Sequence, residues 1–189
     1  MAEKKKLKIA VLMGGESAER DVSLATGAGV IAGFRQAGHE AIGIDTALGA
    51  GQLSGPETTE TPLIKEKPPD SKELSAYSGE TTIRTVSSPD LRLVDLVFVA
   101  LHGGMGENGT IQALLDLLKI PYTGSGVLAS AIAMDKLAAK KVVSASGIPT
   151  PDCIVRDSKD LTDEDMLIEA VKESVGFPVV VKPNDQGSS

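Results

Sequence analysis

Two apolar stretches that end near glycines constrain the fold of this chain most strongly. Residues 7–13 read LKIAVLM and residues 93–101 read LVDLVFVAL, and a pair of glycines follows each within two residues. Nearly continuous rather than alternating hydrophobicity is typical of strands covered on both faces, as in a parallel sheet. Helical patterns over 21–40 and 109–120 follow these runs. The alternation predicts an α/β fold with a largely parallel sheet.

The remaining segments continue this alternation of strands and helices. From Ile111 onward, isoleucine and leucine fall at i, i+3, i+4 and i+7, the spacing of an amphipathic helix. The other predicted elements are strands at 40–45, 120–126, 150–156 and 177–182 and helices at 127–147 and 161–176, with Asp21, Ser23 and Thr162 as possible helix caps and Gly38 as a helix end.

Residues 47–92 differ from the rest of the chain in composition. They hold five of the ten prolines, many serines, threonines and glutamates, and a single aromatic residue, Tyr77. Such a segment buries little apolar surface by itself. We therefore predict a long, mostly irregular surface insertion without a chemical role, with one hairpin at about residues 80–86.

Composition excludes several classes of protein. A net charge of −7 argues against broad nucleic-acid binding, which usually needs a basic face. A single cysteine, Cys153, leaves no internal disulfide framework and fits a reducing compartment. The basic N-terminus leads into an apolar run too short for a signal peptide, and no run approaches the roughly 18 apolar residues of a membrane helix. We expect neither a nucleic-acid nor a membrane partner.

Three glycine-containing loops are the candidate ligand sites. They read GGESAERD at 14–21, HGGMGENG at 102–109 and KPNDQGSS at 182–189, and each follows a predicted strand. In open α/β sheets, ligands bind beyond the carboxyl ends of the strands. Glycines there let a ligand approach the backbone, and a helix start offers free N–H groups to anions.

The side chains in these loops each allow two interpretations. Glu19 either caps the following helix or faces the cleft and holds a substrate ammonium. His102 is either a structural residue or a ligand contact, and Lys182 is either solvated or a phosphate ligand beside the Gly-Ser-Ser turn. Asp45, at the end of a predicted strand, stands where a nicotinamide-binding domain has its ribose ligand, although GGESAE departs from the G-x-G-x-x-G pattern.

Several longer motifs give this chain a family resemblance. GGESAERDVSL, ALHGGMGENGTIQALLDLLKIPYTGSGVLASAIAMDK, GIPTP and PVVVKPNDQGSS closely resemble the D-alanine–D-alanine ligases of the ATP-grasp superfamily. The resemblance covers nearly the whole chain except the proline-rich insertion. It implies a Rossmann-like substrate-binding domain over 1–126, followed over 127–189 by an incomplete first lobe of an ATP-grasp domain. It also implies that the chain is the N-terminal half of a ligase and is inactive by itself.

The resemblance implies a cytoplasmic enzyme of peptidoglycan precursor synthesis that uses ATP and Mg²⁺ to join two D-alanines. In such enzymes the carboxylate of the first D-alanine is phosphorylated, and the amine of the second displaces the phosphate. The magnesium ligands are expected outside this chain, and self-association into a homodimer is possible. The alternatives are a D-alanine–D-lactate ligase, another ATP-grasp carboxylate–amine ligase, or a folded fragment that is not an enzyme.

The resemblance also implies roles for individual residues. Glu19 matches the glutamate that holds the ammonium of the first D-alanine, and His102 matches a histidine of the dipeptide site. Lys136, which Lys140 accompanies on the same helix face, and Lys182 match two lysines that contact ATP phosphates. Ser188 matches a catalytic serine that hydrogen-bonds the glutamate, and it joins Gly187 in the loop over the phosphates.

Overall fold

The computed structural model describes residues 5–49, 69, 71–157, 159 and 164–187. They form two compact units, the first ending at Ala131 and the second comprising Ile132–Gly187. The domain boundary after residue 126 stays a prediction. No helix in the described ranges has the length and apolarity needed to cross a membrane. The elements are β1 (Lys8–Met13), α1 (Arg20–Gln36), β2 (Glu40–Asp45), α2 (Ser71–Leu74), α3 (Gly79–Val86), η2 (Pro89–Leu93), β3 (Leu96–Val99), η3 (Gly104–Gly106), α4 (Thr110–Leu118), α5 (Val127–Met134), α6 (Lys136–Ala145) and α7 (Glu164–Ser174).

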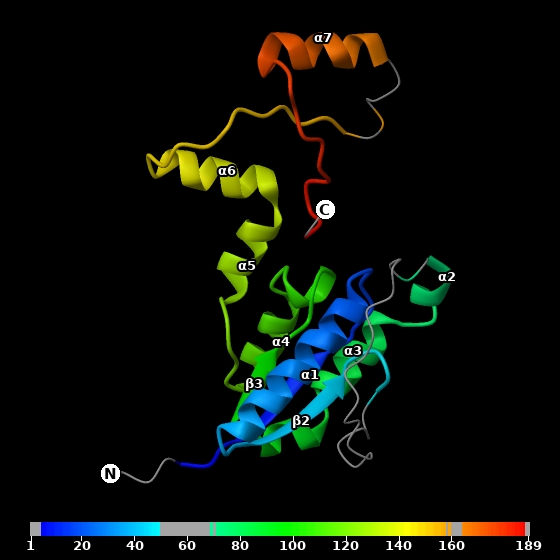
Figure 1. Cartoon of the computed structure of the whole chain (residues 1–189), viewed down its shortest axis with the longest axis vertical. Coiled ribbons are helices and arrows are strands. Elements are labelled where there is room, and N and C mark those ends of the chain that lie inside the picture. Colours follow the sequence, from blue (N-terminus) through cyan, green and yellow to red (C-terminus); the bar gives the residue numbers. More distant parts are fainter. Residues whose placement is uncertain (1–4, 50–68, 70, 158, 160–163, 188–189) are drawn as a thin grey trace. The chain divides into compact units, whose positions relative to one another are not determined.

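The first unit contains the predicted parallel sheet. Its strands lie in the order β2-β1-β3, and β1 is parallel to both neighbours (Figure 1). Met13 pairs with Asp45, and Leu12 pairs with Val99, so the three strands end at one edge of the sheet. Instead of the strand predicted over 120–126, the described residues show one isolated parallel bridge, between Val97 and Tyr122.

Side chains of β1 enter the core on both faces of the sheet, as its continuous hydrophobicity predicted. Ile9 and Val11 pack with α1 residues such as Val30, Ile31 and Phe34. Ala10 and Leu12 belong to the cluster on the other face, which includes Val86 from α3, Leu91 from η2 and Ile111 and Leu115 from α4. Covering both faces anchors the strand whose carboxyl end carries the first glycine loop.

Helix α1 crosses from β1 to β2 and differs from the prediction at its start. It begins at Arg20 with Glu19 in the N-cap position, so neither Asp21 nor Ser23 is the cap. The Ser23 hydroxyl instead donates a 2.8 Å hydrogen bond to the carbonyl of Ala100, just beyond β3. The helix ends as predicted near Gly38, which has a φ of +91°.

The hairpin predicted at residues 80–86 is wrong, because this segment is helix α3. The Ser78 side chain caps it by accepting a 3.3 Å hydrogen bond from the Thr81 N–H. Thr82, Thr85 and Val86 are buried at i, i+3 and i+4, which is a helical spacing on the core side. Their β-branched side chains favour a strand, but the spacing of the buried positions is that of a helix. The described part of 47–92 is therefore largely helical and contributes to the core, whereas residues 50–68 and 70 lie outside the described residues.

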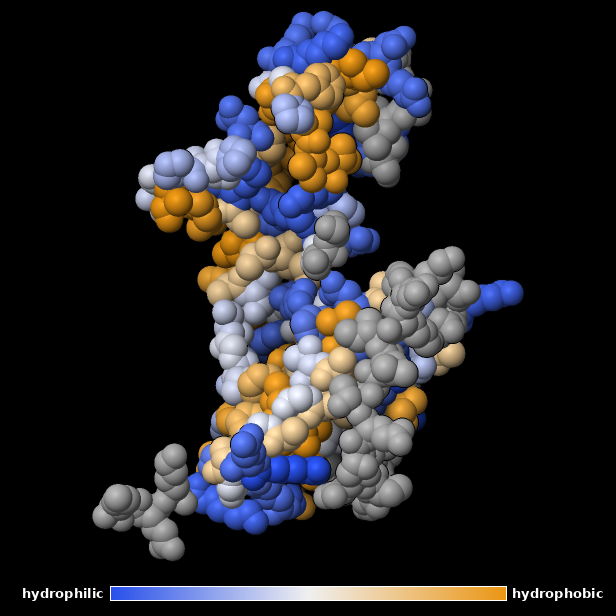
Figure 2. All heavy atoms as spheres, viewed as in Figure 1, coloured by the Kyte–Doolittle hydropathy of each residue, from blue (hydrophilic) through white to orange (hydrophobic). Residues whose placement is uncertain are grey.

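The second unit is less regular than predicted. The helix expected over 127–147 is divided at Asp135 into α5 and α6, and residues 150–156 and 177–182 form no strand. Val180 and Val181 are 79% and 91% exposed, and hydrophobic residues are prominent on the visible surface of this unit (Figure 2). A strand needs a neighbour for its backbone hydrogen bonds, and the sheet of the described residues contains only β1, β2 and β3. Thr162, a possible cap, lies outside the described residues.

Candidate functional site

The ends of β1 and β3 bring the first two glycine loops together. The Ser17 hydroxyl donates a 2.5 Å hydrogen bond to the carbonyl of His102, across 85 residues of sequence. The same oxygen accepts a 3.2 Å hydrogen bond from the Glu19 N–H. Ser17 therefore fixes the start of α1 against the loop that carries His102.

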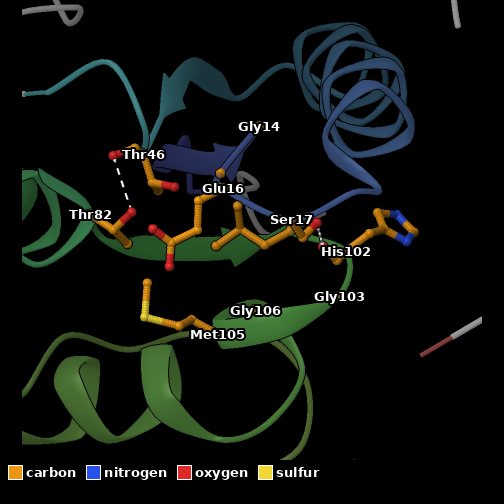
Figure 3. A pocket seen from close by; sticks show the side chains of 11 residues that line it. Gly14, Glu16, Ser17, Thr46, Thr82, His102, Gly103, Met105 and Gly106 are labelled. Atoms are coloured by element: carbon orange, nitrogen blue, oxygen red, sulfur yellow. Dashed lines mark hydrogen bonds between the residues drawn. The ribbon is translucent and has the colours of Figure 1, made fainter. Parts of the chain in front are cut away.

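A cleft opens between these loops on the side of β2. It is a shallow cleft whose empty space of about 250 Å³ includes open solvent, and Glu16, Thr46, Thr82 and Met105 line it together with glycines of both loops (Figure 3). Thr82 donates a 3.4 Å hydrogen bond to the Thr46 carbonyl, so α3 supplies one wall. Figure 3 shows the His102 ring pointing away from Glu16 and Met105. His102 is nevertheless among the residues that line the cleft, so the cleft and the His102 ring are neighbours.

The His102 ring takes part in a second group of side chains. Glu19, His102 and Glu107 each offer one ligand atom, and these atoms lie within 4.8 Å of one another. The Nε2 atom of His102 lies 3.1 Å from the Thr26 hydroxyl, and its Nδ1 atom lies 4.0 Å from a Glu107 carboxylate oxygen. The structure therefore brings together the two residues predicted to bind substrate, Glu19 and His102, whereas Glu107 and Thr26 were missed. A polar residue five positions after His102 in the same glycine loop was the available signal for Glu107.

Glu19 lies at the start of α1 but does not cap it through its side chain. Its carboxylate lies against Gly103, where an added Cβ would come within 2.8 Å of the Glu19 Oε2 atom. Gly103 also has a φ of +68°, which L side chains rarely adopt. The Glu19 side chain thus makes no capping hydrogen bond, although a carboxylate at the start of α1 still interacts favourably with the helix dipole, and its role in binding substrate stays a prediction.

A buried ion pair contacts the backbone of the first glycine loop. Arg20 and Asp45 form a two-pronged pair, and an Arg20 nitrogen also donates a 2.9 Å hydrogen bond to the Gly15 carbonyl. The Tyr77 ring lies 4.4 Å from the centre of the guanidinium. Burial lowers the pKa of Arg20, but the contacts with Asp45 and Tyr77 outweigh it and raise the pKa overall. Asp45 is thus buried and committed to Arg20, which argues against its use as a ribose ligand in a nicotinamide site.

In the second unit, Lys136 contacts the last glycine loop, which begins at Lys182. Lys136 donates its backbone N–H to the Asn184 carbonyl over 3.0 Å and its ammonium to the Gln186 carbonyl. Lys182 is exposed and Gly187 is half-buried, while Ser188 lies outside the described residues. The ammonium of Lys140 instead contacts Thr150, at 3.0 Å. Lys136 and the loop after Lys182 are therefore neighbours, and their phosphate contacts stay predictions.

Asp135 is the N-cap residue of α6. Because its carboxylate can be protonated, we predict that its contribution to the stability of the second unit depends on pH. Its carboxylate accepts a 2.8 Å hydrogen bond from the Ala138 N–H, and this bond and the Asn184 side chain lower the pKa of Asp135. A lowered folded-state pKa means that the stabilisation is present above the unfolded pKa, near pH 4, and is lost as pH falls through the folded pKa. We expect Asp135→Ala to lower the melting temperature of the second unit by a few degrees at pH 7, as is typical of a lost cap.

The difference between the unmodified chain and Asp135→Ala should disappear in acid, where the carboxylate of the unmodified chain is protonated too. Thermal melts followed by circular dichroism from pH 7 to pH 3 measure this. Asp152→Ala is the control, because Asp152 is an exposed aspartate of the same unit. A difference that stays constant across this pH range would contradict the capping role.

Comparison with known proteins places this site in a family. A family model described as "D-ala D-ala ligase N-terminus" matches residues 8–125, which include all three strands and both glycine loops of the site. The chain belongs to this family. The match contains Glu19, His102 and Glu107, and the first unit is therefore the family's N-terminal region.

Individual relatives cover the second unit as well. The D-alanine–D-alanine ligase of Pelotomaculum thermopropionicum is 40% identical over 185 residues, which are 97% of this chain and 47% of the relative. The ligase of Geobacter sulfurreducens is 39% identical over 188 residues, which are 99% of this chain and 46% of the relative. The chain thus spans about half the length of the curated relatives it matches.

Solved structures give the same result for the fold. A D-alanine–D-alanine ligase from Bacillus anthracis complexed with ATP has a TM-score of 0.62 and 32% identity, covering 96% of this chain and 50% of that one. A D-Ala:D-Ser ligase from Enterococcus faecalis has a TM-score of 0.61 and 29% identity, covering 97% of this chain and 54% of that one. The family resemblance inferred from sequence and the α/β fold class are both confirmed.

Proposed function

We propose that residues 1–189 supply the binding site for the first D-alanine, and part of the ATP site, of an ATP-dependent D-alanine–D-alanine ligase. The observation that carries this proposal is the position of the Glu19 carboxylate. It makes no cap hydrogen bond to α1, lies beside a histidine at the carboxyl edge of the sheet, and faces a glycine that admits close approach. A carboxylate in this position suits the ammonium group of an amino acid.

The proposed chemistry divides between the two units. Glu19 binds the ammonium of the first amino acid and so orients its carboxylate for phosphorylation. Lys136 and Lys182 offset the negative charge of the ATP phosphates, because phosphoryl transfer depends mainly on positioning and electrostatic stabilisation. A D-Ala:D-Ser ligase among the similar structures supports leaving the second substrate open. D-Alanine is our first choice, and D-lactate is the alternative.

The magnesium ion expected of such a reaction does not fit the cluster of Glu19, His102 and Glu107. Mg²⁺ prefers six oxygen ligands in octahedral geometry, and this cluster includes an imidazole nitrogen. No step is therefore assigned to magnesium through these residues. A cytoplasmic location and a homodimer likewise remain proposals that rest on the family.

A chimera tests the proposed function. Residues 1–189 replace the matching half of the P. thermopropionicum ligase, and phosphate release from ATP is measured with D-alanine alone, with D-alanine plus D-lactate, and with neither. We expect release that requires D-alanine and yields the dipeptide, and no turnover from residues 1–189 by themselves. Phosphate release by a folded chimera that is independent of D-alanine would contradict the proposal, and ester formation would favour the D-lactate alternative.

A further inference from the structure

We propose that Tyr77 is a positioning residue for the amino-acid site. Its aromatic ring holds the Arg20 guanidinium, and Arg20 in turn holds the first glycine loop in the path that places the Glu19 carboxylate. The centroid of the Tyr77 ring lies 4.4 Å from the guanidinium carbon of Arg20. Tyr77 belongs to the segment whose composition predicted no chemical role. The proposal rests on the proposed function only for the ligand that Glu19 binds, because the contacts that carry it lie within the chain.

The Arg20 guanidinium is held both at its edge and at its face. Its two terminal nitrogens donate to the Asp45 carboxylate, and both side chains are buried. The Tyr77 ring, which is half-buried, covers the face. A guanidinium is attracted to the face of an aromatic ring, more strongly where water is excluded. A planar guanidinium fixed at its edge and its face keeps one orientation, in which it donates the 2.9 Å hydrogen bond to the Gly15 carbonyl.

The hydrogen bond to Gly15 sets the path of the chain to Glu19. Gly15 has a φ of +80°, and a glycine has a wide choice of backbone conformations unless its neighbours restrict them. Further along the loop, the Ser17 hydroxyl accepts from the Glu19 N–H over 3.2 Å, and the Ser17 carbonyl accepts from the Arg20 N–H over 3.1 Å. Residues 15–20 thus form a loop that the side chain of its last residue closes. Because misplacement of a binding group by about 1 Å can cost about a hundredfold in activity, a tilt of this guanidinium should affect binding by Glu19.

Hydrogen bonding and packing in turn hold Tyr77 in place. Its N–H donates a 3.0 Å hydrogen bond to the Leu74 carbonyl at the end of α2, and α3 begins two residues later, at Gly79. A Cβ added to Gly79 would lie 3.5 Å from the Glu16 carboxylate and 3.5 Å from the Met105 methyl, which belong to the first and the second glycine loop. The start of α3 therefore lies against both loops, and this packing gives Tyr77 a fixed position beside the site.

Amide exchange of residues 1–189, followed by NMR, tests the action of Tyr77 without any ligase activity. The Glu19 and Arg20 amides report on the loop, because both donate to Ser17. Tyr77→Leu removes the ring face and should speed their exchange about three- to tenfold, the size expected of a lost cation–π contact. Tyr77→Phe keeps the ring face, so these exchange rates should stay within about twofold of those of the unmodified chain. Unchanged exchange in Tyr77→Leu, or an equal increase in Tyr77→Phe, would overturn the proposal.

Tyr122 provides the matched control, since it is the only other tyrosine of the chain and belongs to the same unit. It forms the isolated bridge beside β3. Tyr122→Leu should leave the exchange of the Glu19 and Arg20 amides within about twofold, because their local opening does not depend on that end of the unit. A loss of overall stability in either leucine variant would instead speed the exchange of the β1 amides, which separates a general effect from a local one. Equal effects of Tyr122→Leu and Tyr77→Leu on the Glu19 and Arg20 amides would contradict the proposed role.

Kinetics of the chimera test whether this loop geometry serves substrate binding. Tyr77→Leu should raise the KM for D-alanine about three- to tenfold and leave the KM for ATP unchanged, whereas Tyr77→Phe and Tyr122→Leu should change neither KM by more than about twofold. If Tyr77→Leu lowers only the melting temperature, Tyr77 has a purely structural role and the proposal fails. If the parent chimera shows no D-alanine-dependent activity, the proposed function fails, and the exchange measurement alone then decides whether Tyr77 positions the loop.

Discussion

Arg20→Ala is expected to lower the free energy of unfolding of the first unit by about 3–5 kcal/mol. Arg20 and Asp45 are 8% and 5% exposed, so removal of the guanidinium leaves an uncompensated carboxylate in the core. The Gly15 carbonyl loses a donor and the Tyr77 ring loses its cation at the same time. The free energy of unfolding of a small protein is only about 5–15 kcal/mol, so this substitution removes a large part of it.

An exposed ion pair in the same unit provides the matched control for Arg20→Ala. Arg84 and Glu80 pair across one turn of α3 with side chains 71% and 79% exposed. Arg84→Ala should therefore cost about 0.5 kcal/mol or less. Urea unfolding, with amide exchange of β1 and β2 to report on the first unit, measures both variants. Equal effects of the two substitutions would show that the buried pair is not a structural anchor.

Hydrophobic patterns predicted the sheet because they reflect burial directly. The nearly continuous apolar residues of β1 and β3 could be covered only on both faces, and the structure places them in this way. Helix α3 was missed because its threonines and valine have the composition of a strand, and only their i, i+3, i+4 burial makes them helical. Val180 and Val181 have strand composition too, yet the described residues provide no neighbouring strand for them.

The candidate site was predicted only as far as position along the chain allowed. Glu19 and His102 stood out because each follows a predicted strand, and parallel strands end at one edge. Thr26 was not predicted, because a threonine inside a helix has no distinguishing pattern, and it meets His102 only through the packing of α1 near the end of β3. The contact of Arg20 with Tyr77 likewise joins the first residue of α1 to the segment whose composition predicted a surface insertion.

Glu19→Gln in the chimera is expected to raise the KM for the first D-alanine by about ten- to a hundredfold. A hydrogen bond to a charged group contributes about 1.5–3 kcal/mol, and each 1.4 kcal/mol is about tenfold in affinity. The amide keeps the size of the side chain but removes the charge that attracts the ammonium. The KM for ATP should change little, because the lysines proposed to contact phosphate belong to the second unit.

Two further variants make the Glu19 result specific. Glu40→Gln, at an exposed glutamate, controls for the loss of one negative charge. Glu16→Gln removes a carboxylate from the cleft that Glu16 lines with Thr46 and Thr82. A large KM effect from Glu16→Gln and none from Glu19→Gln would place the amino acid in that cleft. If both KM values hold and only the melting temperature falls, Glu19 has a structural role alone, because lost substrate binding must appear in KM or in kcat/KM.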